Sequence, residues 1–153
     1  DETLKNIGYI SHCRNCLHRQ TKKGLASAIE ENCPVCGEKL VHAGPLWLGN
    51  IQDKEFIQKM IDESENKKIN TKKQALKLLN SCLQEADAPA TFFDIHSICK
   101  SLKISAPKLD LIFDELKNKG FAAIKTHYNP LGIKTDANIS DLKKILVGLS
   151  NDH

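Results

Sequence analysis

Two closely spaced pairs of cysteines constrain this chain more than any other feature of its sequence. Cys13 and Cys16 form one CxxC pair, and Cys33 and Cys36 form a second pair after an interval of sixteen residues. Each pair lets two thiolates approach one ion from a single turn, and two such turns complete a tetrahedron, as in zinc ribbons and rubredoxin-type knuckles. The spacing therefore predicts that the four cysteines bind one metal ion, and zinc is the favoured ion.

A metal site filled by four sulfur ligands has a structural role, because it leaves no open position for water or substrate. We therefore expect the ion to hold the fold and not to catalyse hydrolysis. Iron in a rubredoxin-like site would support electron transfer, and this alternative stays open at the level of sequence.

The overall composition is that of a globular protein. The chain has 153 residues, of which 41% are hydrophobic and 27% are charged, enough for one ordinary domain or two small ones. No apolar stretch has the length of a transmembrane helix or the pattern of a signal peptide, so the cysteines favour metal over disulfides and we expect a cytoplasmic protein. The cysteine motif begins soon after Asp1, which suggests a piece of a longer protein.

A polar stretch at residues 62–70 carries almost nothing to bury and predicts a boundary between one domain at residues 1–66 and another at residues 67–153. The first domain has 8 Lys+Arg against 10 Asp+Glu, a net charge of −2, and the second has 14 against 9, a net charge of +5. A polyanion should therefore meet the second domain first.

The predicted elements of the first domain surround the cysteines. Short strands and knuckles are expected over residues 9–43, and a loop rich in Gly and Pro over residues 44–49. Asp53 is a plausible N-cap for the helix that follows.

In the second domain, apolar residues recur at helical spacing in four segments. Thr71 to Pro89 should contain the first helix, Thr91 and Asp94 resemble a capping box for the second, and Ser105 can cap the third with Pro107 in its first turn. Strands are expected at residues 121–127 and 133–137, and a last helix at residues 139–149. This order is that of a winged helix. The predicted fold class is α+β, with a small zinc-ribbon-like domain built on the four cysteines, followed by a winged-helix-like domain.

We find no nucleotide-binding or catalytic motif in the sequence, which contains no G-x-G-x-x-G, P-loop, H-E-x-x-H or G-x-S-x-G pattern. Cys82 and Cys99 fall on apolar helix faces and are expected in the core. The sequence therefore predicts no catalytic residue in this chain.

The basic residues of the second domain favour the predicted hairpin over the third helix as a nucleic-acid contact. On that helix, three lysines are offset by three acids, which argues against insertion into a DNA groove. The hairpin combines phosphate-binding charge with a stacking ring in Lys125, His127, Tyr128 and Lys134. A solvated hairpin that only covers the core is the alternative.

Three segments resemble one known family. They are residues 33–37 (CPVCG), residues 44–49 (GPLWLG) and residues 125–137 (KTHYNPLGIKTDA). Together, in this order and separation, they resemble the C-terminal region of the tRNA guanine-N2 dimethyltransferases, which modify guanosine 26 of tRNA. Members usually carry Arg where this chain has Lys125.

The resemblance implies a function for the whole chain. In that family a methyltransferase domain that binds S-adenosylmethionine precedes this region, and the region helps to hold the tRNA. The chain would then be an inactive tRNA-binding part of an enzyme. The expected tRNA contacts are Lys125, Thr126, His127, Tyr128, Lys134 and Thr135. The residues expected to face the catalytic domain are Gly44, Pro45, Leu46 and Trp47.

Two other functions stay open on sequence alone. One is a zinc-ribbon and winged-helix transcription protein that binds duplex DNA. The other is a protein-interaction module in which the loop around Trp47 serves as a docking surface.

Overall fold

The computed structural model describes residues 2–26 and 28–151, and these residues form helices together with two small antiparallel sheets. A mixed helix and sheet composition was predicted, and it is confirmed. Within the described residues, no helix is long and apolar enough to cross a membrane.

The first sheet gathers the segments that carry the four clustered cysteines. Helix α1 (Glu2–Lys5) leads into β1 (Ile7–Cys13), which lies between β2 (Arg19–Lys23) and β3 (Leu40–Trp47). Both pairings are antiparallel. We call β1, β2 and β3 the N-terminal sheet, in which β3 is an edge strand.

The predicted loop at residues 44–49 is wrong in its first four residues, because β3 continues to Trp47. The register between β1 and β3 shifts here, so that Gly44 and Pro45 on β3 oppose the single residue Tyr9 on β1. An edge strand tolerates Pro at such a bulge, because the missing N–H is not needed for a second neighbour. Gly44 has a φ of 154°, and a Cβ there would lie 2.4 Å from the Tyr9 ring.

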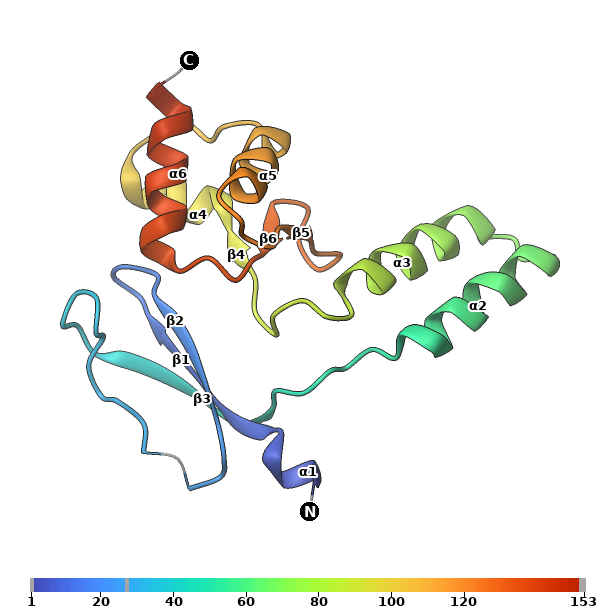
Figure 1. Cartoon of the computed structure of the whole chain (residues 1–153), viewed down its shortest axis with the longest axis horizontal. Helices are drawn as coiled ribbons and strands as arrows, with labels where there is room; N and C mark the ends of the chain where they lie inside the picture. Colours follow the sequence, from blue (N-terminus) through green and yellow to red (C-terminus); the bar gives the residue numbers. More distant parts are fainter. Residues whose placement is uncertain (1, 27, 152–153) are drawn as a thin grey trace.

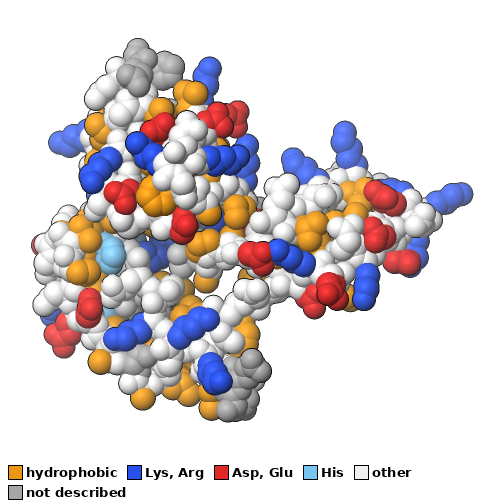
Figure 2. All heavy atoms as spheres, in the orientation of Figure 1, with side chains coloured by type: hydrophobic (Ala, Val, Ile, Leu, Met, Phe, Trp, Pro, Cys, Tyr) orange, Lys and Arg blue, Asp and Glu red, His pale blue; other side chains and the backbone are white. Residues whose placement is uncertain are grey.

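Two helices form a hairpin that stands away from the rest of the chain (Figure 1). They are α2 (Lys54–Asn66) and α3 (Lys72–Glu85), and they pack on each other. Asp53 caps α2 as predicted, since its side chain accepts a hydrogen bond from the N–H of Phe56 at 3.0 Å. We call the two helices the helical arm, and lysine side chains stand out from it (Figure 2). The predicted boundary at residues 62–70 falls at its free end, and the division into domains stays a prediction.

The rest of the chain forms what we call the C-terminal body. Its sheet has the order β4-β6-β5, so the first and last strands both pair with the middle one in antiparallel fashion. Its elements are β4 (Phe93–Asp94), α4 (Ile95–Leu102), α5 (Leu109–Asn118), β5 (Ile124–Lys125), β6 (Gly132–Lys134) and α6 (Ile139–Asn151).

The main hydrophobic core lies in the C-terminal body, where α4, α5 and α6 surround the inner face of β6. Its side chains have at most 8% of their surface exposed. The members are Ile95, Ile98, Cys99, Ile112, Phe113, Leu116, Ile133, Ala137, Ile139, Leu142, Ile145 and Leu146. These residues include most of the apolar stripes that the sequence predicted for the last three helices.

Two helix starts in the C-terminal body differ from the prediction. The N-cap of α4 is Asp94 itself, which accepts a hydrogen bond from Ser97 N at 3.2 Å, so Thr91 is not the capping residue. Helix α5 begins at Leu109 instead of directly after Ser105. Pro107 explains the second error, because a proline disfavours helical geometry in the residue before it.

The strands of the predicted hairpin, β5 and β6, are shorter than expected. Side chains accept hydrogen bonds from the backbone on both sides of the paired residues. The N–H of Ala122 donates to Asp136 Oδ1 at 2.8 Å, and the N–H of Ala137 donates to Thr135 Oγ1 at 3.1 Å. These bonds replace ladder pairing outside β5 and β6. Gly120 follows α5 with a left-handed φ of 82°, which favours glycine.

The N-terminal sheet lies against the C-terminal body through the turn between β1 and β2 (Figure 1). Leu17 packs against the core of the body. Arg19 donates from Nη1 to the carbonyl of Phe92 at 2.5 Å, and its guanidinium lies 5.7 Å from the centroid of the Phe93 ring. The segment that carries two of the clustered cysteines therefore also contributes a contact between the two parts.

Candidate metal centre and a buried carboxylate network

The structure brings the four predicted metal ligands together. The Sγ atoms of Cys13, Cys16, Cys33 and Cys36 all lie within 4.8 Å of one another. Two pairs are closer, with 3.4 Å between Cys13 and Cys36 and 3.5 Å between Cys16 and Cys33. Each short pair joins one CxxC turn to the other, so the cluster holds the two turns face to face.

The cluster fits a tetrahedral ion. A Zn–S bond of roughly 2.3 Å implies about 3.8 Å between sulfurs, which lies inside the observed range. The two turns have the same backbone form. Leu17 N donates to Cys13 O at 3.0 Å, Gly37 N donates to Cys33 O at 2.9 Å, and both donor residues have a positive φ, 66° and 78°. Two equivalent knuckles around four thiols are the donor set of a structural zinc site.

The protonation of the four thiols differs with their surroundings. Burial raises the pKa of the Cys16 thiol to about 12, whereas a hydrogen bond from the backbone at Glu38 lowers the pKa of the exposed Cys36 thiol to about 6. Without a cation, sulfurs this close cannot all carry negative charge. A divalent ion reverses this balance, because its charge favours the thiolate form of every ligand.

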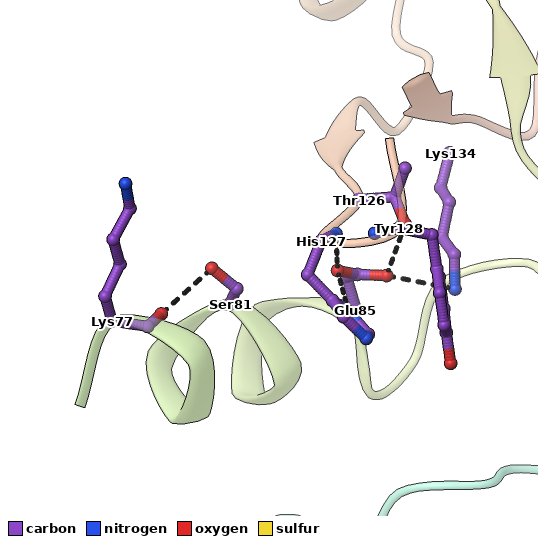
Figure 3. A network of polar contacts seen from close by, with 7 residues as sticks. All are labelled: Lys77, Ser81, Glu85, Thr126, His127, Tyr128 and Lys134. Atoms are coloured by element: carbon purple, nitrogen blue, oxygen red, sulfur yellow. Dashed lines mark hydrogen bonds and ion pairs between the residues drawn. The ribbon is translucent and has the colours of Figure 1, made fainter. Parts of the chain in front are cut away.

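The second site is a buried carboxylate that the sequence did not single out. The side chain of Glu85, at the end of α3, is 0% exposed and points into the hairpin between β5 and β6 (Figure 3). His127 N donates to Glu85 Oε1 at 2.5 Å, and His127 Nδ1 lies 2.8 Å from the same oxygen. Thr126 Oγ1 donates to Oε2 at 2.9 Å, and Lys134 Nζ lies 3.2 Å from it.

These contacts keep Glu85 ionised. Burial alone would raise the pKa of the carboxyl, but the hydrogen bonds from His127, Thr126 and Lys134 outweigh it, and the pKa of Glu85 is lowered from its ordinary value. The carboxylate in turn compensates the ammonium of Lys134, whose side chain is only 7% exposed. Glu85 thus ties the helical arm to the hairpin.

The six residues predicted to contact tRNA divide into two groups. The side chains of Thr126, Lys134 and Thr135 are buried, with 5–6% of each residue exposed. Lys125 and Tyr128 are exposed, and Tyr128 keeps 60% of its surface in solvent. His127 lies between the two groups, because its side chain is 20% exposed and its Nδ1 contacts Glu85. The structure therefore brings the six residues to one hairpin and turns three of them inward.

The outward group forms a small surface of charge and aromatic rings. The rings of His127 and Tyr128 lie 3.9 Å apart between centroids, tilted by 36°. Lys125 Nζ lies 3.5 Å from Asp110 Oδ1 and 5.4 Å from the centroid of the Phe113 ring. Since both side chains of the Lys125–Asp110 pair are largely exposed, solvent screens this pair strongly.

Sequence reasoning missed Glu85 because its partners lie 41 to 49 residues further along the chain. One signal was present. Glu85 follows Cys82 by three residues, so it sits beside the apolar stripe of its own helix, where an acid needs a partner.

The residues predicted to face a catalytic domain lie on the outer edge of the N-terminal sheet. Leu46 and Trp47 are 40% and 44% exposed on β3. Trp47 Nε1 donates to Asn50 O at 3.1 Å, which fixes the ring beside the start of the segment that leads to α2. A role for this edge as an interface stays a prediction.

The fold and the cysteine cluster together define a two-part α+β chain built around a closed four-thiol centre. A family model described as N2,N2-dimethylguanosine tRNA methyltransferase matches residues 1–147. The chain belongs to this family.

Relatives named tRNA (guanine(26)-N(2))-dimethyltransferase are similar over almost the whole chain. The protein of Methanobrevibacter smithii is 63% identical over 100% of this chain and 39% of its own length. That of Methanothermobacter thermautotrophicus is 47% identical over 97% of this chain and 39% of its own length.

One solved structure extends the comparison to the fold. It is described as a complex of Trm1 from Pyrococcus horikoshii with S-adenosyl-L-methionine, and it is 34% identical with a TM-score of 0.79. The match covers 95% of this chain and 36% of that one. The chain thus spans about two fifths of the length of the curated relatives it matches. The DNA-binding alternative finds no support in these comparisons.

Proposed function

We propose that this chain is the tRNA-binding C-terminal part of a tRNA (guanine(26)-N2)-dimethyltransferase that works in the cytoplasm. The observation that carries the proposal is the match of nearly the whole chain to relatives with this name, of which it spans only 39%. Binding of S-adenosylmethionine and methyl transfer would belong to the part of the enzyme outside the chain. The absence of any catalytic motif in the sequence agrees with this division.

In this proposal the four cysteines hold one structural zinc ion. The ion would supply charge and four bonds that fix the two knuckles, and it would leave no open ligand position. By fixing the knuckles, the cysteines place Leu17 and Arg19 against the C-terminal body. The metal site would therefore set how the N-terminal sheet meets the tRNA-binding part.

The C-terminal body serves as a winged-helix-like module whose hairpin touches the tRNA. Lys125 would pair with a phosphate, and the rings of Tyr128 and His127 would stack on a base or sugar. The inward group has a different task. Thr126 and Lys134 bind Glu85, and Thr135 shapes the turn after β6, so these residues hold the hairpin in the form that presents the outward group.

The exposed edge at Gly44, Pro45, Leu46 and Trp47 would face the catalytic domain. Its apolar side chains and unpaired strand edge suit a contact with another domain better than a contact with nucleic acid.

Binding of labelled tRNA to the 153-residue chain at several salt concentrations tests the proposal. We expect weak binding that falls steeply with salt, and a further loss in Lys125→Glu and Tyr128→Ala. Lys100→Glu makes the same charge change on the exposed face of α4 and serves as the matched control. Equal affinity of Lys125→Glu and the control would remove the hairpin as a contact.

Two further measurements separate the alternatives. Duplex DNA should compete poorly with tRNA, and efficient competition would favour the transcription protein. The chain mixed with labelled S-adenosylmethionine and tRNA should transfer no methyl group, and transfer would show that catalysis lies within the chain.

A further inference from the structure

The helical arm carries a strongly basic segment that the hairpin does not account for. Residues 67–84 contain Lys67, Lys68, Lys72, Lys73 and Lys77 and no Asp or Glu. They form the free end of the arm and most of α3 (Figure 1). A helix as long as α2, with 13 residues, spans about 20 Å, so the free end stands well away from the body.

Three of these lysines are available to a partner. Lys67 is paired with Glu63 at 2.8 Å, and Lys72 Nζ donates to the carbonyl of Glu65 at 2.5 Å. For Lys68, Lys73 and Lys77, by contrast, Nζ has neither a hydrogen bond nor an ion pair among the described residues, and all three are exposed. We call these three the arm lysines.

Two of the arm lysines, Lys73 and Lys77, continue a line that starts at the hairpin, while Lys68 lies before α3 at the free end of the arm. Lys73, Lys77, Ser81 and Glu85 follow at four-residue spacing, which places each beside the next on the surface of α3. Lys77 extends to the side of α3 on which Thr126 and His127 meet Glu85 (Figure 3). The basic surface thus runs from the hairpin along α3 toward the free end of the arm.

The distance along this line indicates the kind of partner. The twelve residues from Lys73 to Glu85 correspond to about 18 Å of helix. This exceeds the screening length of about 8 Å at physiological salt. A small anion bound at the arm lysines therefore gains little from the charges at the hairpin. Only an extended polyanion can use both, and lysine ammonium groups suit phosphates that are contacted without reading the base.

We propose that the arm lysines form a second contact for the phosphate backbone of the tRNA, separate from the contact at Lys125 and Tyr128. This inference rests on the proposed function and assigns the helical arm a direct part in it. The arm would fix the position of the RNA along α3, while the hairpin contacts it at the base of the arm.

The test compares two triple variants of the 153-residue chain in tRNA binding. One is Lys68→Gln, Lys73→Gln, Lys77→Gln, and glutamine keeps the helix propensity of lysine. The control is Lys39→Gln, Lys100→Gln, Lys143→Gln, which removes the same charge outside the arm. Far-ultraviolet circular dichroism verifies that both variants keep their helices.

The arm variant should bind tRNA about tenfold to 100-fold more weakly at about 150 mM salt, and the slope of log K against log salt should fall by about 2 to 3. The control should change affinity less than about threefold and leave the slope as it is. Equal behaviour of the two variants overturns the inference and leaves the proposed function standing. If the unaltered chain binds no tRNA at any salt, the proposed function fails and the inference fails with it. Unchanged tRNA binding with loss of contact to the catalytic domain would also overturn it, in favour of a protein partner.

Discussion

The N-terminal sheet and the C-terminal body are each stabilised in a different way. Around the sheet, the buried apolar cluster consists of Cys13, Cys33 and Leu40, and two of its three members are predicted metal ligands. The body encloses the large core between its three helices and β6. A small sheet without a core needs another source of stability, whereas the body gains its stability from burial. The comparison predicts that a metal ion and the hydrophobic core stabilise separate parts of one short chain.

Removal of the metal should have the largest effect on stability. It tests most directly whether the two parts are stabilised separately. Zinc contributes about 10 kcal/mol or more to the folding of small zinc domains, and the N-terminal sheet has little to replace it. A chelator, or Cys16→Ser, should therefore unfold the sheet and leave α4, α5 and α6 protected. Fluorescence of Trp47, the only tryptophan, reports on the sheet, and hydrogen exchange reports on the body.

The control for this experiment is Cys82→Ser, because Cys82 is half-buried on α3 and lies outside the cluster. It should leave the response to the chelator unchanged. If chelation unfolds both parts in one transition, the predicted boundary at residues 62–70 is wrong and the contact through Leu17 and Arg19 joins the parts into one unit.

Glu85→Gln should have the next largest effect on stability. It tests how much a buried ion pair adds to the stability that the body gains from its apolar core. The substitution leaves the buried ammonium of Lys134 without its carboxylate, which costs about 3 to 5 kcal/mol in comparable buried pairs. We expect the free energy of unfolding of the body to fall by that amount in urea denaturation, with Trp47 fluorescence less affected. Glu63→Gln removes an exposed pair and should cost less than about 1 kcal/mol. Equal costs for the two substitutions would contradict the network.

Acid should produce the smallest effect, through the same carboxylate. The pKa of folded Glu85 lies below its ordinary value of 4.5, so the ionised form stabilises the fold at any pH above about 4.5. This contribution is lost as the pH falls through the folded pKa. The stability difference between the unaltered chain and Glu85→Gln should therefore shrink below about pH 4.5 in denaturation measured on the body. A difference that stays constant down to about pH 3 would show that the fold does not lower the pKa of Glu85.

Local patterns predicted the parts of the structure that depend on near neighbours. The two cysteines of each CxxC pair lie together because their turn closes on itself, and the cap at Asp53 depends on a residue three positions away. The apolar stripes of α4 and α6 follow from helical spacing for the same reason. Such features need no knowledge of the rest of the fold.

Features that depend on distant partners were predicted poorly. Pro45 reads as a loop residue, but pairing with β1 draws it into an edge strand. Lys134 and Thr126 were predicted as surface residues that contact RNA. In the structure they are buried and contact Glu85 of α3. In both cases tertiary contacts override a correct local preference, because a bulge or a buried charge pair is stable only when the partner segment is in place.

The carboxylate of Glu85 also has a mechanical consequence. It lies at the last residue of α3, and it binds the backbone and side chain of His127 together with Thr126 and Lys134. Any tilt of the helical arm at its base would have to break several of these bonds at once. A tilt of the arm at its base is therefore coupled to a movement of the hairpin that carries Tyr128 and His127.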